Sequence, residues 1–197
     1  MKTKPSIIGT GSTKFGERWE DGIREMVSHA CVNALKSAGI EAKEVDSLFV
    51  ANCFASSING QSNLNALCSD ELGIQNAVSI GGADAAGAYA MAQAANSIMS
   101  GQSKISLVLG VEKMSDLPIT DITKITSEIL SQDFEASTGA TLAGLYAMIT
   151  LRHMKEHGTT GKQLDMVSVK NHSNAVENGI SQFKFKVTRE DVAKSPM

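Results

Sequence analysis

The sequence has few of the residues that mark specialised classes of protein. Its 197 residues include three cysteines, three prolines and one tryptophan, and aromatic residues make up 5% of the chain. Cys31, Cys53 and Cys68 form no C-x-x-C pair and match no zinc-binding spacing. A disulfide framework and a cysteine-based metal site are therefore not expected, and we interpret all three cysteines as structural residues.

Charge of one sign and long apolar runs are also missing. The formal net charge is −3 and no basic stripe occurs, so nucleic acid is not an expected partner. No run reaches the roughly 20 apolar residues that a bilayer-spanning helix needs. The short run Ile7-Ile8 is too brief for a signal peptide. These absences predict a cytoplasmic protein that binds neither nucleic acid nor a membrane.

What the chain does contain is an alternation of strand-like and helix-like segments. Strands are expected within residues 5–10, 47–52, 77–80 and 105–109. Helices are expected at 21–38, 63–72, 85–99, 140–154 and 162–176, with no helix near the end of the sequence. Glycines at 39, 73, 101 and 158 serve as stop signals. This order predicts an α/β fold whose sheet is mostly parallel, with helices on both faces.

Residues 117–138 interrupt the regular pattern. They contain Pro118, several threonines and several acidic residues, and they show no clear period. We predict that they form a long loop excursion. A loop of this length is uncommon in a compact domain unless it has a functional or interface role.

The segment Gly81–Ala88 is the strongest functional candidate in the sequence. It leads from an expected strand into an alanine-rich helix, and its polar residue is Asp84. A helix N-terminus presents free N–H groups and a positive dipole end. Asp84 is therefore a candidate base, with a helix N-cap worth about 1 kcal/mol as the structural alternative. Glu112 follows the strand at 105–109, and in parallel sheets such strand ends carry the sites.

Other polar residues are weighed against structural roles. Glu112 and Lys113 are either ligand contacts or a solvated or ion-paired turn, and the second interpretation is favoured. His172, beside Lys170 and Asn171, is expected to be a hydrogen-bonded structural histidine rather than a residue that orients a site. The remaining histidines are His29, His153 and His157. The last two are four residues apart, but an exposed helix face explains them better than a metal site.

Several segments, taken in order, resemble the N-terminal half of a thiolase. They are Ser100-Gly101 with 107–116, Thr138–Thr141 with 145–148, His157–Thr160 with 169–172, and 191–197. The resemblance is to the branch of the sterol carrier protein thiolases and their acetyl-CoA acetyltransferase relatives. It implies an N-terminal thiolase-like domain at 1–116 and 139–197, with 117–138 inserted in it. It also implies that the C-terminal thiolase half is absent from this sequence.

The resemblance carries expectations about chemistry. Thiolases of lipid metabolism transfer an acyl group from coenzyme A to a cysteine thiolate, without a covalently bound cofactor. In the family pattern that cysteine occupies the position of Asp84, and the serine two residues later is replaced here by Ala86. A carboxylate is a weak nucleophile toward a thioester. Three hypotheses stay open: an acyl-CoA acyltransferase subunit, a carbon–carbon lyase that uses Asp84 as a base, and a non-catalytic subunit.

A partner is expected under each hypothesis. The candidates are a C-terminal thiolase half, a second thiolase-like subunit or a zinc-binding OB-fold protein. The helix at 85–98 is small and apolar nearly all round, and such a helix is usually buried on every side. The sequence therefore predicts a homo- or hetero-oligomer with residues 80–100 at or near an interface.

Overall fold

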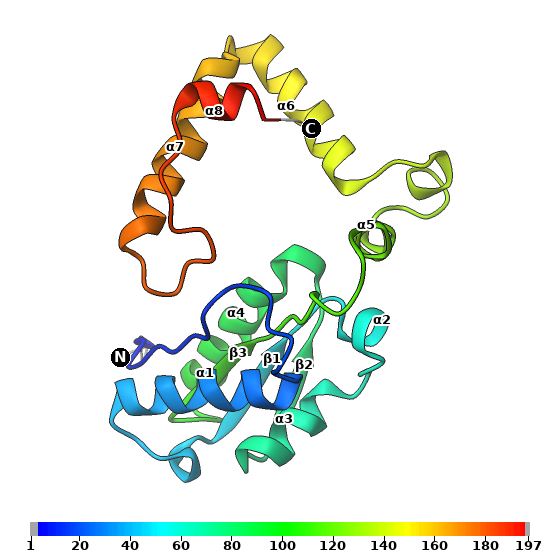
Figure 1. The fold of residues 1–197 in the computed structure, drawn as a ribbon. Coiled ribbons are helices and arrows are strands. Elements are labelled where there is room, and N and C mark those ends of the chain that lie inside the picture. Colours follow the sequence, from blue (N-terminus) through cyan, green and yellow to red (C-terminus); the bar gives the residue numbers. More distant parts are fainter. Residues whose placement is uncertain (1–3, 196–197) are drawn as a thin grey trace. The chain divides into compact units, whose positions relative to one another are not determined.

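The computed structural model describes residues 4–195, which divide into two compact units (Figure 1). The first unit contains residues 4–13 and 18–129. The second contains residues 14–17 and 130–195. The boundary at Ile129 falls inside the segment 117–138, and each unit is described by itself.

A parallel three-stranded sheet forms the centre of the first unit. Its strands are β1 (Ser47–Ala51), β2 (Ala77–Ile80) and β3 (Ser106–Gly110), in the order β2-β1-β3. Leu48 of β1 pairs with Ala77 on one side and with Leu107 on the other. Every residue of β1 is buried, which explains why this segment is apolar along nearly its whole length.

Helices cover both faces of this sheet. The helices are α1 (Ile23–Ala38), α2 (Ala55–Asn59), α3 (Leu64–Leu72) and α4 (Ala86–Met99), and a short turn η1 (Ala42–Glu44) precedes β1. Side chains alternate along β1: Leu48 and Val50 join the core under α1 and α3, whereas Phe49 and Ala51 pack with α4. The α/β architecture, with its parallel sheet and helices on both faces, is therefore confirmed (Figure 1).

The end of the first unit is more helical than its sequence suggests. The predicted excursion contains α5 (Ile119–Thr126) and the 3₁₀ turn η3 (Ser127–Ile129), and α5 contacts α2. Another 3₁₀ turn, η2 (Ala83–Ala85), precedes α4. The elements of 117–138 thus belong partly to the sheet-containing unit.

The second unit is helical throughout its described elements. It comprises the 3₁₀ turn η4 (Ala136–Thr138), α6 (Leu142–His157), α7 (Gly161–Glu177) and α8 (Arg189–Ala193). Gly158 ends α6 with a φ of 71°, as the sequence predicts. A capping box between Thr160 and Gln163 begins α7.

Two expectations about the chain ends are wrong. Residues 5–10 form no strand, because the segment lies along α1 instead: a side chain at Gly9 would collide with Ala34 and Ala38. Ile7 is left 71% exposed. Near the other end α8 forms where no helix was predicted. Its signal is the capping box between Thr188 and Asp191, a local pattern that hydrophobic periodicity does not reveal.

Candidate functional site

The carboxyl edge of the parallel sheet gathers the polar residues that follow its three strands. Cys53 follows the central strand β1, Asp84 follows β2 and Glu112 follows β3. Burial raises the pKa of the Cys53 thiol, and the negative charges of Glu112, Asp84 and Glu128 raise it further. These groups therefore act on one another electrostatically, and the Cys53 thiol is held in its protonated form.

Asp84 lies in the 3₁₀ turn that connects β2 to α4. This turn places the helix start at Ala86, with Ala85 at the N-cap position and no side-chain cap bond. The alternative in which Asp84 caps α4 is therefore wrong, because η2 inserts a further turn before the helix. The Asp84 side chain is exposed, and no residue in the described range 4–195 forms a hydrogen bond or ion pair with it. A free carboxylate thus stands at the positive end of α4.

The backbone just before Asp84 is strained. Gly82 has a φ of 151°, which side chains rarely allow, and Ala83 has a φ of 49° in the left-handed region. The left-handed conformation costs a residue that has a Cβ roughly 1–2 kcal/mol of conformational energy. Strain of this kind, seen directly in a backbone angle, is typical of ligand-binding and catalytic turns.

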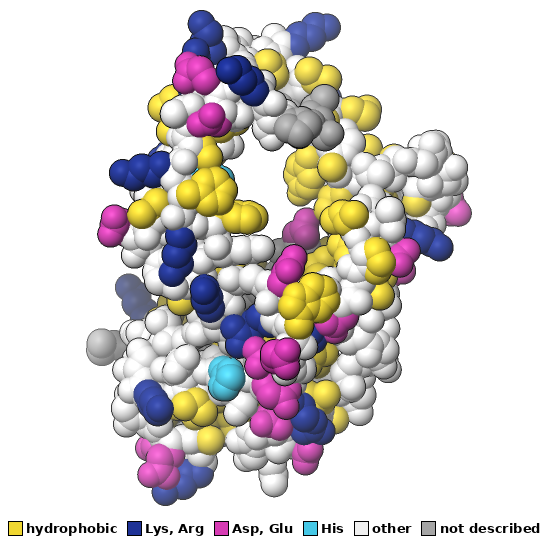
Figure 2. Space-filling model, in the orientation of Figure 1, with side chains coloured by type: hydrophobic (Ala, Val, Ile, Leu, Met, Phe, Trp, Pro, Cys, Tyr) yellow, Lys and Arg dark blue, Asp and Glu magenta, His cyan; other side chains and the backbone are white. Residues whose placement is uncertain are grey.

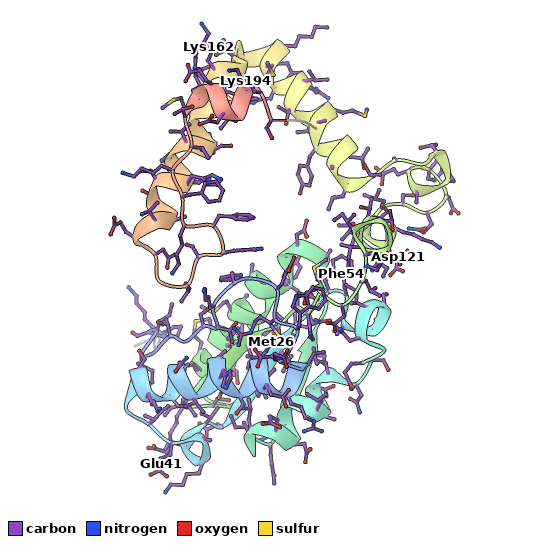
Figure 3. The ribbon with its side chains drawn as sticks, viewed as in Figure 1. Met26, Glu41, Phe54, Asp121, Lys162 and Lys194 are labelled. Carbon is purple, nitrogen blue, oxygen red and sulfur yellow. The ribbon has the colours of Figure 1, made fainter. Side chains whose placement is uncertain are left out.

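Glu112 holds the loop between β1 and α2. Its carboxylate accepts hydrogen bonds from the backbone N–H groups of Cys53 and Phe54, the residue labelled at this edge in Figure 3. Asn52 supports the same loop by donating to the Val111 carbonyl at 2.6 Å. Burial raises the pKa of Glu112, although these hydrogen bonds oppose the increase. Glu112 is thus neither a solvated turn residue nor a free ligand contact.

Lys113, the next residue, is buried and fully engaged within the first unit. Its Nζ donates to Asp116 at 2.7 Å and to the carbonyl of Arg18 at 3.1 Å. This agrees with the ion-paired interpretation. A cavity of about 350 Å³ beside it does not include Asp84; its lining is Gly22, Ile23, Arg24, Glu25, Asn59, Gln61, Leu67, Lys113 and Asp116.

The four histidines all lie on helices of the described chain. His172 Nδ1 donates to the Phe185 carbonyl at 3.1 Å, and its ring packs on Phe183 and Phe185, which confirms a hydrogen-bonded structural histidine. The rings of His153 and His157 lie 4.7 Å apart on an exposed face of α6. Lys170, Asn171 and His29 are exposed on their helices. Within residues 4–195 no three His, Cys, Asp or Glu side chains are placed to hold a metal ion.

Two residues near Asp84 were not expected from the sequence. Cys53 was interpreted as structural, but it follows β1 at the same sheet edge, a position that the strand-end rule would have indicated. Tyr89 lies in the first turn of α4 and packs against Gly82. The contact between Tyr89 and Gly82 depends on the folded backbone and could not be found from the sequence.

No helix in the described part of the chain has the length and apolar character needed to span a bilayer.

Comparison with known proteins finds similarity along nearly the whole chain. Residues 6–193 match the family model "Thiolase, N-terminal domain". An acetyl-CoA acetyltransferase of Methanocaldococcus jannaschii is 42% identical over 192 residues, which cover 96% of this chain and 48% of that protein. The benzoylsuccinyl-CoA thiolase subunit BbsB of Thauera aromatica is 30% identical, over 99% of this chain and 49% of its own.

A solved structure shows the same fold. The structure named "Ltp2-ChsH2(DUF35) aldolase" matches with a TM-score of 0.78 at 21% identity, covering 97% of this chain and 48% of that one. The chain thus spans about half the length of the relatives it matches.

Proposed function

Because the chain belongs to the thiolase family and matches its N-terminal domain, we propose that it forms one half of an enzyme acting on coenzyme A thioesters. The second half is a C-terminal thiolase half in the same protein or on a partner subunit. The relation to acetyl-CoA acetyltransferases and to a subunit of a CoA thiolase supports this proposal. A cytoplasmic location and a place in lipid metabolism remain predictions of the same proposal.

The observation that carries the proposal is the free carboxylate of Asp84 at the end of β2. It stands at a helix N-terminus, on a strained turn, at the sheet edge where parallel α/β proteins bind ligands. In the thiolase pattern this is the position of the cysteine nucleophile. An aspartate side chain can occupy the same position, but it serves better as a base than as an acyl acceptor.

This exchange favours a carbon–carbon lyase as the reaction. Asp84 would take the hydroxyl proton of a β-hydroxyacyl thioester, and the Cα–Cβ bond would break as the β carbon becomes a carbonyl. The electron pair would pass to the Cα as a thioester enolate, which then takes up a proton. The structural neighbour named an aldolase fits this alternative, and its name pairs Ltp2 with a second protein.

The partner forms part of the proposal. A zinc-binding OB-fold protein or a second thiolase-like subunit would complete the site that this half leaves open. The non-catalytic alternative predicts equally tight association but assigns no chemical role to Asp84. Replacing the Asp84 carboxylate separates these possibilities.

The test uses the full chain purified with its second half or partner. We expect Asp84→Asn to lower carbon–carbon cleavage of a β-hydroxyacyl-CoA by at least about 100-fold, as loss of a positioned base does. Asp121→Asn is the matched control, since Asp121 is exposed in the first turn of α5 (Figure 3). Asp84→Cys tests whether thiolase acyl transfer returns. Unchanged turnover in Asp84→Asn would leave only the non-catalytic subunit.

A further inference from the structure

Tyr89 closes over the turn that carries Asp84. It lies in the first turn of α4, its side chain is 54% exposed, and its ring reaches back to Gly82. A Cβ placed on Gly82 would lie 2.6 Å from Cδ2 and 2.8 Å from Cε2 of Tyr89. Aromatic side chains in helices lean toward the N-terminus, which is the direction seen here. The ring therefore occupies the space above Gly82.

The turn needs such a contact. Ala83 is held at a φ of 49°, and a strained conformation persists only where its surroundings determine it. The backbone supplies one restraint, a hydrogen bond of 3.0 Å from the Ala85 N–H to the Gly82 carbonyl. The Tyr89 ring supplies a second restraint from the side-chain direction. The backbone of Ala83 sets where the next residue, Asp84, points.

We propose that Tyr89 is a positioning residue for Asp84. Its ring packs on Gly82, keeps the Gly82-Ala83 turn in its strained form and so fixes the backbone that carries the Asp84 carboxylate. The contact is made by ring carbons, so the phenol hydroxyl is not required. This inference rests on the proposed role of Asp84, but the ring contact itself is measurable without any reaction.

The contact is tested by nuclear magnetic resonance on the full chain with its partner. Gly81-Gly82 is the one Gly-Gly pair in the sequence, so protein labelled with ¹⁵N- and ¹³C-carbonyl glycine gives a single correlated amide signal, that of Gly82. We expect an aromatic ring-current shift of this signal. Tyr89→Phe should keep the shift and Tyr89→Ala should abolish it. If the chemical shift of the Gly82 amide is the same in Tyr89→Ala as in the wild-type chain, the inference is wrong.

The positioning role is tested by kinetics in the same complex. Misplacement of a reacting group by about 1 Å costs roughly 100-fold in rate, so Tyr89→Ala should lower kcat about 10- to 100-fold with KM nearly unchanged. Tyr89→Phe should retain wild-type kcat. The control is Val32→Ala, which truncates an exposed side chain on α1, outside the predicted interface at 80–100, and should keep wild-type kcat.

The outcomes separate this inference from the proposed function. If Asp84→Asn leaves turnover intact, the proposed function fails, while the Gly82 signal still decides whether the ring holds the turn. If Asp84→Asn abolishes turnover and Tyr89→Ala does not change kcat, the positioning role is wrong. Loss of kcat in both Tyr89→Ala and Tyr89→Phe would also overturn it, because the hydroxyl rather than the ring would then be needed.

Discussion

At the scale of single residues, the partly buried carboxylate of Glu112 stabilises the loop between β1 and α2, beside the candidate site. Glu112 joins β3 to the start of α2 through the N–H groups of Cys53 and Phe54. Its pKa is raised by burial above the ordinary value of 4.5. The folded chain therefore binds this proton more tightly than the unfolded chain does.

The pH dependence of stability follows from that difference. Between pH 4.5 and the raised pKa of Glu112, the folded state holds more protons than the unfolded state, so the free energy of unfolding falls as pH rises through this window. Glu112→Gln has no charge to desolvate and can still accept the two N–H bonds. We expect denaturant titrations across this pH range to show a smaller fall for Glu112→Gln than for the wild-type chain.

Controls make the assignment specific to Glu112. Glu25→Gln, at an exposed position of α1, is the matched control for the loss of one carboxylate. Glu112→Ala should lower the free energy of unfolding by about 1–3 kcal/mol, because two backbone donors lose their acceptor. Identical pH profiles for Glu112→Gln and the wild-type chain would contradict this account.

At the scale of elements, buried serine hydroxyls fix the end of α4 to the sheet. Ser103 Oγ lies 2.9 Å from Ser47 Oγ of β1 and 2.8 Å from Ser97 Oγ of α4. Ser47 also contacts Ser106 of β3 at 3.0 Å. The network positions α4 at the end opposite to Asp84, so it helps to set the angle of the helix that begins at the candidate site.

Removing the central hydroxyl should destabilise the first unit. Ser103→Ala leaves the hydroxyls of Ser47 and Ser97 with one partner fewer in a buried place, and we expect a loss of about 1–3 kcal/mol in the free energy of unfolding. Chemical denaturation measures this loss. Ser56→Ala is the control, since Ser56 is exposed on α2. Equal stability of the two variants would show that the network contributes little.

Helix ends also show which local signals are sufficient. Gly39 ends α1 with a φ of 70°, as predicted, and Thr160 caps the start of α7 near the predicted position. These positions were predictable because a left-handed glycine or a capping threonine acts within a few residues. The start of α4 at Ala86 rather than Ala85 could not be predicted in this way. It depends on the 3₁₀ turn η2, whose conformation is set by the position and direction of the chain as it leaves β2.

At the scale of the whole molecule, many large apolar side chains of the described residues are exposed to solvent. Hydrophobic side chains lie on the surface of the described chain (Figure 2). In the second unit one described apolar side chain, Leu130, is buried, while α6 exposes Tyr146, Met148, Ile149 and Leu151. On α4 of the first unit, Met91 is 45% exposed. Surfaces of this kind are typical of interaction sites.

We therefore expect the full chain to associate at micromolar concentration, with itself or with a partner half. Met91→Glu should weaken the association by placing a charge in the predicted interface at 80–100. Gln102→Glu adds the same charge to an exposed loop position and should have little effect. Sedimentation velocity measures both variants. A clean monomer at micromolar concentration would contradict the predicted oligomer.

The sequence by itself determined the alternation of strands and helices, the buried central strand and the placement of Asp84 at a strand-to-helix turn. These features follow from periods and turn residues that act over short distances. Only the tertiary structure decided that residues 5–10 leave the sheet, that Glu112 holds the loop at Cys53, and that Tyr89 covers Gly82. Each of these depends on contacts between residues that are brought together by folding, and no local pattern records them.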